Sequence, residues 1–137
     1  MLKLMKVPMI FVRGGSILLI VTAFLYLYLG YPYVSKGLFA ANLDAGLSGE
    51  VKAVWLGFCL HLFFIAYLLL ANSRRSNPHR FVVMLCGLII LVDGFIVRAF
   101  LTDKNFAAQL LLISGLLILL GCFCWFQFQR THDNARI

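Results

Sequence analysis

The sequence predicts an all-α fold: an integral membrane bundle of four transmembrane helices, with both termini in the cytoplasm. Of its 137 residues, 63% are apolar and only 12% are charged. An average soluble domain carries roughly 25% charged residues. So few charges cannot cover the surface of a soluble enzyme, and the apolar content also excludes a disordered chain. The four cysteines are too few for a disulfide-rich secreted module of this length.

Four apolar runs have the length of a membrane span, which is about 20 residues. They cover residues 14–33, 51–71, 81–101 and 105–129, and together they make residues 1–137 a single transmembrane domain. The first run has the basic start of a secretory signal peptide. No small-x-small cleavage site follows it closely, so we expect it to be a retained helix.

The basic residues lie on alternate connections. Eight of the twelve precede the first run, separate the second from the third, or follow the fourth: Lys3, Lys6, Arg13, Arg74, Arg75, Arg80, Arg130 and Arg136. Cytoplasmic loops carry such an excess, so both termini and the central loop are expected inside, in a bacterial inner membrane. We therefore interpret the net charge of +7 as a topology signal rather than as a nucleic-acid surface. Arg74, Arg75 and Arg80 are candidate contacts for lipid headgroups.

The connections contain helix-start signals. The first outer connection, residues 34–49, retains several apolar residues, and we expect a short interfacial helix or turn there. The three later spans are preceded by capping residues: Ser48 with Glu50, Asn77 with Pro78, and Thr102 with Asp103.

Two ionisable residues lie deep within predicted spans. Asp93 is eight residues, or about 12 Å, from the outer end of the third span, and His61 is about 15 Å from the outer end of the second. A carboxylate in lipid needs a donor, so we expect His61 and Asp93 to face each other. The pair could bind a ligand or relay a proton, but it could equally serve only to join two helices. His61 could also be satisfied by a neighbouring hydroxyl or carbonyl.

A second pair is expected nearer the surface. Glu50 lies on the same helical stripe as His61, with Gly57 between them to allow close approach, and Arg98 is three residues inside its span. Glu50 and Arg98 are therefore expected to form a partly hydrated ion pair. However, Arg98 is about 140° around the helix from Asp93, so the two pairings compete.

The remaining candidate groups favour packing over chemistry. The four cysteines lack C-x-x-C spacing, and only His61 among the histidines lies within a span, so we expect no metal, haem or other cofactor. Small residues on the last two spans should let those helices approach closely: Gly87, Gly94, Ser114, Gly115 and Gly121.

The layout of four helices, with an acid at the start of the second and an arginine late in the third, resembles small bacterial membrane proteins of the DoxX-like group. Glu50, Gly57 and Arg98 carry this resemblance, and the layout spans most of the chain. The glycine-lysine ending of the first helix that is typical of that group is not clearly present. The resemblance implies no established activity.

Two functions compete. The preferred hypothesis is a non-enzymatic accessory subunit that packs against a larger membrane complex or forms a homo-oligomer, since the chain has no extramembrane domain and few reactive groups. The alternative is binding or transport of a quinone, a lipid or protons through a polar pocket that contains Glu50, His61, Asp93 and Arg98.

Overall fold

The structure is a computed structural model that describes residues 6–42, 44–75, 78–100 and 106–134. The described residues form helices joined by turns, and no strand occurs among them. The elements in chain order are α1 (Lys6–Leu25), a π-helical turn η1 (Tyr26–Gly30), α2 (Tyr31–Ala40), α3 (Ala45–Ser73), α4 (Arg80–Phe100) and α5 (Phe106–Asn134). Within these residues, four helical segments are long and apolar enough to cross a membrane.

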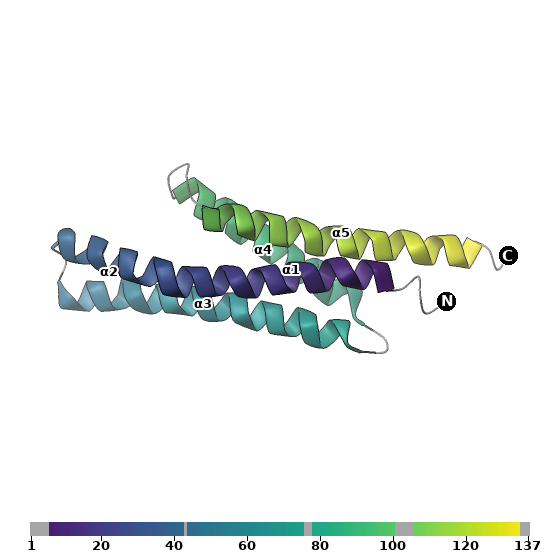
Figure 1. The fold of residues 1–137 in the computed structure, drawn as a ribbon, viewed down its shortest axis with the longest axis horizontal. Coiled ribbons are helices and arrows are strands. Elements are labelled where there is room, and N and C mark those ends of the chain that lie inside the picture. The colour runs from purple at the N-terminus through teal and green to yellow at the C-terminus, as the bar shows by residue number, and fades with distance from the viewer. Residues whose placement is uncertain (1–5, 43, 76–77, 101–105, 135–137) are drawn as a thin grey trace.

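The first segment is longer than the sequence predicted. α1, η1 and α2 continue one another in a single rod, of which Pro8–Ala40 reads as one 33-residue apolar segment (Figure 1). The predicted span of 14–33 therefore captures only its middle. At 1.5 Å per residue the rod measures about 50 Å, whereas the hydrocarbon core of a bilayer is about 30 Å thick.

Residues 34–49, where a short interfacial helix or turn was expected, belong to the end of α2, a turn at Ala41 and Asn42, and the start of α3. Asn42 has a left-handed backbone with φ of 52°, which commonly ends a helix. The N-cap of α3 is Asp44, whose Oδ1 accepts a hydrogen bond from the Leu47 amide at 2.8 Å. The prediction of a cap at Ser48 was wrong because α3 starts earlier, at Ala45. The capping residues predicted at Asn77, Thr102 and Asp103 lie outside the described residues.

α1 and α5 are the central pair of the bundle. α5 packs along α1 and α4, α3 packs on the other side of α1, and α3 meets α4 over a much shorter stretch (Figure 1). α4 and α5 form an antiparallel hairpin, as expected. The start of α1 and the end of α5 lie at the same end of the bundle, and the α2–α3 hairpin extends beyond α4 at the other.

Close contacts between helices occur at glycines, as the sequence predicted. A Cβ added to Gly115 on α5 would lie 3.0 Å from the Leu91 amide nitrogen on α4. One added to Gly94 on α4 would lie 2.8 Å from the Leu112 side chain. Only glycine permits this spacing, so α4 and α5 are held backbone to backbone. The core around them is apolar and includes Leu19, Leu62, Leu69, Ile90, Leu111 and Ile118.

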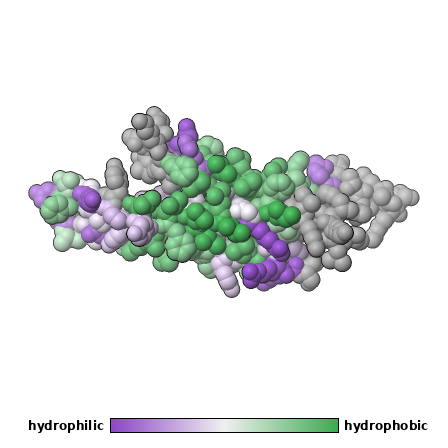
Figure 2. Space-filling model, viewed as in Figure 1, coloured by the Kyte–Doolittle hydropathy of each residue, from purple (hydrophilic) through white to green (hydrophobic). Residues whose placement is uncertain are grey.

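The surface is hydrophobic along the middle of the bundle and hydrophilic toward the end of the α2–α3 hairpin and near the end of α3 (Figure 2). Large apolar side chains point outward from every long helix, among them Ile17, Phe64, Val92 and Leu116. In water such a surface would drive aggregation, and in a bilayer it contacts acyl chains.

Candidate functional site

The structure brings His61 and Asp93 together. Nε2 of His61 on α3 lies 3.2 Å from Oδ2 of Asp93 on α4, and no other acidic side chain that the structure describes contacts a basic one so closely. The expectation that these two residues face each other is thus confirmed. An ionised carboxylate can only accept a hydrogen bond, so with Asp93 charged the Nε2 atom is the donor.

Both side chains lie beside closely packed faces of their helices. Leu62 is fully buried, and the neighbouring His61 is about 100° around α3, at the edge of the buried face. Gly94 lies against Leu112 of α5, and Asp93 is likewise about 100° from that contact. The 3.2 Å contact places both polar groups in the seam between α3 and α4.

The pair is not enclosed. The His61 side chain is 41% exposed and that of Asp93 is 19% exposed, although both lie within apolar spans. A histidine and a carboxylate in contact can exchange a proton, and together they offer donor and acceptor atoms to a polar group of another molecule. The chemistry available is therefore proton transfer or hydrogen bonding.

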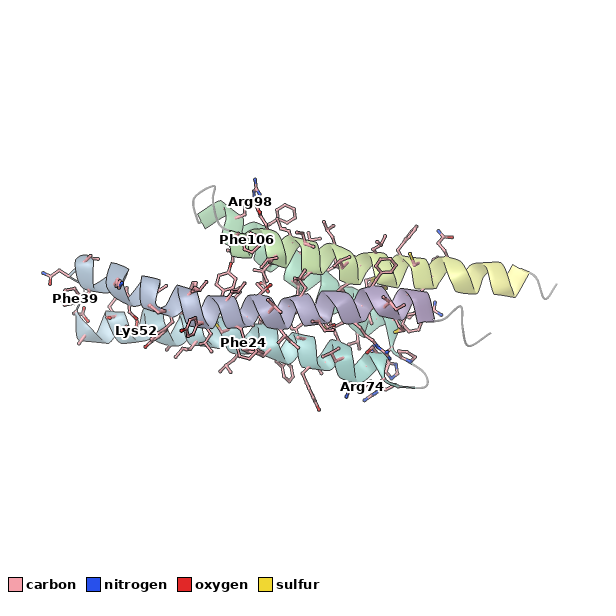
Figure 3. The ribbon with its side chains drawn as sticks, in the orientation of Figure 1. Phe24, Phe39, Lys52, Arg74, Arg98 and Phe106 are labelled. Carbon is pink, nitrogen blue, oxygen red and sulfur yellow. The ribbon has the colours of Figure 1, made fainter. Side chains whose placement is uncertain are left out.

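The structure does not bring Glu50 and Arg98 together, and the predicted pairing was wrong. Both side chains are exposed, and no ion pair joins them. From His61 to Glu50 is eleven residues, about 16 Å along a helix, whereas Asp93 to Arg98 is five residues, about 7.5 Å. With His61 level with Asp93, Glu50 lies well beyond Arg98 on the protruding part of α3. Figure 3 shows Lys52, close to Glu50 in sequence, on this extension (Figure 3).

Gly57 does not serve as a contact point. A Cβ built on it meets no atom within 4 Å, so the expectation of close helix approach at this glycine was also wrong. The residues that carry the DoxX-like resemblance, Glu50, Gly57 and Arg98, therefore do not assemble into one site.

A second polar cluster lies where α3 ends. Arg13 of α1 donates from Nη2 to the Ser73 carbonyl at 3.0 Å and from Nε to Ser73 Oγ at 3.3 Å. The Asn72 side chain donates to the His79 carbonyl and accepts from the His79 amide, both at 3.0 Å. Both ends of the α3–α4 connection are thereby bound. Sequence reasoning missed Asn72, although an asparagine at the last helical turn before a polar loop is a recognisable signal for a side-chain bond to the backbone.

The three candidate headgroup residues differ in their surroundings. Arg74 and Arg75 are exposed and follow α3 directly. Arg80 is partly buried instead, with its guanidinium 5.1 Å from the Trp125 ring centre on α5. Arg80 thus makes a cation–π contact within the bundle, whereas Arg74 and Arg75 face outward.

The π-helical turn forms a small aromatic cluster with α3. Trp55 Nε1 donates to the Tyr26 carbonyl at 3.3 Å, and the Tyr26 ring makes edge contacts with Trp55 and Phe58. A wider turn displaces backbone carbonyls from their usual partners, and the indole satisfies one of them. The Tyr26 hydroxyl is buried without a hydrogen-bond partner.

Comparison of the sequence and structure with protein-family models, curated proteins and solved structures finds no match.

Proposed function

We propose that this chain is a small, non-enzymatic integral membrane protein of a bacterial inner membrane, and that it acts as an accessory subunit packed against a larger membrane protein. The observation that carries the proposal is the incomplete burial of His61 and Asp93 within apolar spans. An Asp at the centre of a spanning helix costs about 2.5–3.5 kcal/mol in insertion experiments. A partner helix laid over the α3–α4 seam would remove this pair from lipid.

The expected orientation rests on the basic residues. Arg13, Arg74, Arg75 and Arg80 lie at the end of the bundle where α1 starts and α3 ends. An excess of arginine at one end favours that end as the cytoplasmic one. This would place the α2–α3 hairpin on the outer side, with both termini inside.

Site-specific photocrosslinking tests the proposal. A photoreactive amino acid at Ile96, one turn from Asp93 and 50% exposed, should crosslink to one larger membrane protein in cells. The matched control is Ile17, which is 57% exposed but lies on α1 instead of α4, and it should give only lipid adducts. Lipid adducts alone from both positions would contradict the proposal.

The competing function is binding or transport of a quinone, a lipid or protons at the same pair. It is favoured by the direct contact of a proton donor with a proton acceptor. Purification in mild detergent separates the two functions. A monomer that retains one small molecule, and loses it on His61→Ala without unfolding, would support the binding protein instead of the subunit.

A further inference from the structure

We propose that Arg74 and Arg75 bind the headgroup of an anionic phospholipid, whose acyl chain lies along the outer face of α3. This site is separate from the His61–Asp93 pair. It needs a firmly held helix end, uncompensated positive charge and an adjoining apolar surface, and the residues that the structure describes supply each of these.

Hydrogen bonds hold the end of α3 directly beside Arg74 and Arg75. Asn72, which is 6% exposed, makes two hydrogen bonds with His79, and Arg13 holds the Ser73 carbonyl. The last carbonyls of α3 carry the negative end of the helix dipole, which would repel an anion. Because Arg13 donates to one of those carbonyls, it offsets this effect beside Arg74.

The positive charge is not compensated by any side chain that the structure describes. Among these residues, Arg74 and Arg75 make no side-chain hydrogen bond or ion pair, and the carboxylates Asp44, Glu50 and Asp93 lie elsewhere. Asp44 and Glu50 belong to the opposite end of the bundle, and Asp93 is paired with His61. A phosphodiester is the anion that a membrane surface offers to two adjacent guanidiniums.

The apolar surface continues from these arginines along α3. Tyr67 lies seven residues before Arg74, the residue that caps α3, so the two share a helix face to within about 20°. Phe64 lies three residues before Tyr67, about one turn further along α3. Tyr67 is 67% exposed and Phe64 is 61% exposed. Figure 3 places Arg74 where α3 ends, and Figure 2 shows a hydrophilic patch there that borders the hydrophobic surface. A headgroup at the patch would leave its acyl chain against these two rings.

Thermal unfolding of the whole chain in mild detergent tests the proposal, with phosphatidylglycerol or phosphatidylcholine of the same acyl chains added. Phosphatidylglycerol should raise the unfolding temperature more than phosphatidylcholine does. The Arg74→Gln/Arg75→Gln variant should remain folded and require at least about tenfold more phosphatidylglycerol for the same rise, since each basic residue near an anionic surface contributes measurably to binding.

The matched control is Lys36→Gln/Lys52→Gln, which removes the same charge from the α2–α3 hairpin and should respond like the unmodified protein. An equal loss in both double variants would mean that net charge alone attracts the lipid, and would overturn the site. Equal stabilisation by phosphatidylcholine would overturn it as well. Stabilisation by glycerol 3-phosphate at the same concentration would show a phosphate site without a role for the apolar face, and would also contradict the proposal.

Discussion

His61 and Asp93 form a polar contact between α3 and α4, which meet over a much shorter stretch than α1 with α5, α4 with α5 or α1 with α3. Their atoms Nε2 and Oδ2 are 3.2 Å apart, while α3 and α4 otherwise meet over a short stretch. The association of α3 with α4 therefore relies heavily on this single hydrogen bond. The association of α1 with α5 relies instead on close packing along much of their length.

A double-mutant cycle on this pair should reveal direct coupling. His61→Ala and Asp93→Ala should each lower the free energy of unfolding, because each leaves a polar partner in an apolar span. The double variant should lose less than the sum, with a coupling energy of about 0.6–1.7 kcal/mol, the range of hydrogen bonds between membrane helices. The measurement is unfolding by a denaturing detergent, followed by circular dichroism.

The control is a second double-mutant cycle, on His61→Ala and Asp44→Ala. Asp44 caps the far end of α3 and is therefore distant from His61. These two changes should be additive. Coupling as large for this distant pair would mean that the unfolding signal does not report on the contact.

Gly115→Ala should destabilise the bundle by about 1–3 kcal/mol, because the new methyl group would overlap the Leu91 backbone, which cannot rotate away. Gly57→Ala makes the same chemical change on a helix where no atom lies within 4 Å. It should be neutral or slightly stabilising, since alanine favours the helix. Thermal unfolding in detergent compares the two. Equal stability of the variants would refute the backbone contact between α4 and α5.

Asn72→Ala should cost about 2 kcal/mol of unfolding free energy, since it removes two hydrogen bonds to the His79 backbone in a partly buried position. It should also increase amide hydrogen exchange at His79. Asn42→Gly is the contrasting change at the opposite connection. Asn42 has a positive φ that glycine adopts freely, so stability there should be unchanged or slightly higher. Unchanged exchange at His79 in Asn72→Ala would argue against the bonds.

Cysteine labelling should establish the orientation. With Cys59, Cys86, Cys122 and Cys124 replaced, a cysteine at position 48 should react with an impermeant maleimide added to intact cells. A cysteine at position 76 should react only after the membrane is opened, because the arginine-rich connection is expected inside. Labelling of position 76 from outside would reverse the assignment of both termini.

The four apolar segments and the His61–Asp93 contact could be predicted from the sequence, because both follow from helix geometry. The apolar runs have the length of a span, and counting 1.5 Å per residue places His61 and Asp93 at similar depth. The close approach of α4 and α5 could also be predicted from the sequence, since helices in lipid usually make contact through small residues.

The predictions that failed depended on where helices begin. Counting inward from an assumed start at residue 51 places Glu50 at the membrane surface and Arg98 only three residues inside it. α3 in fact starts at Ala45, because Asp44 caps it, and the Glu50 side chain lies on the extension of the hairpin. Ser48 and Asp44 are both good N-cap residues. The local sequence alone does not show which of the two residues caps α3, because the choice depends on where α2 ends and the chain turns.

The π-helical turn at Tyr26–Gly30 changes how the first long helix can vary. Such a turn holds one residue more than an α-helical turn, so the residues of α2 are offset by about 100° from the pattern that α1 would project onward. Loss of one residue within this turn would restore regular hydrogen bonding and rotate a different side of α2 toward α3. Deletion of a single codon would thus change which side of α2 faces α3, while leaving the sequences of α1, α3, α4 and α5 untouched. The surface of the protruding hairpin can therefore evolve separately from the bundle through changes at Tyr26–Gly30.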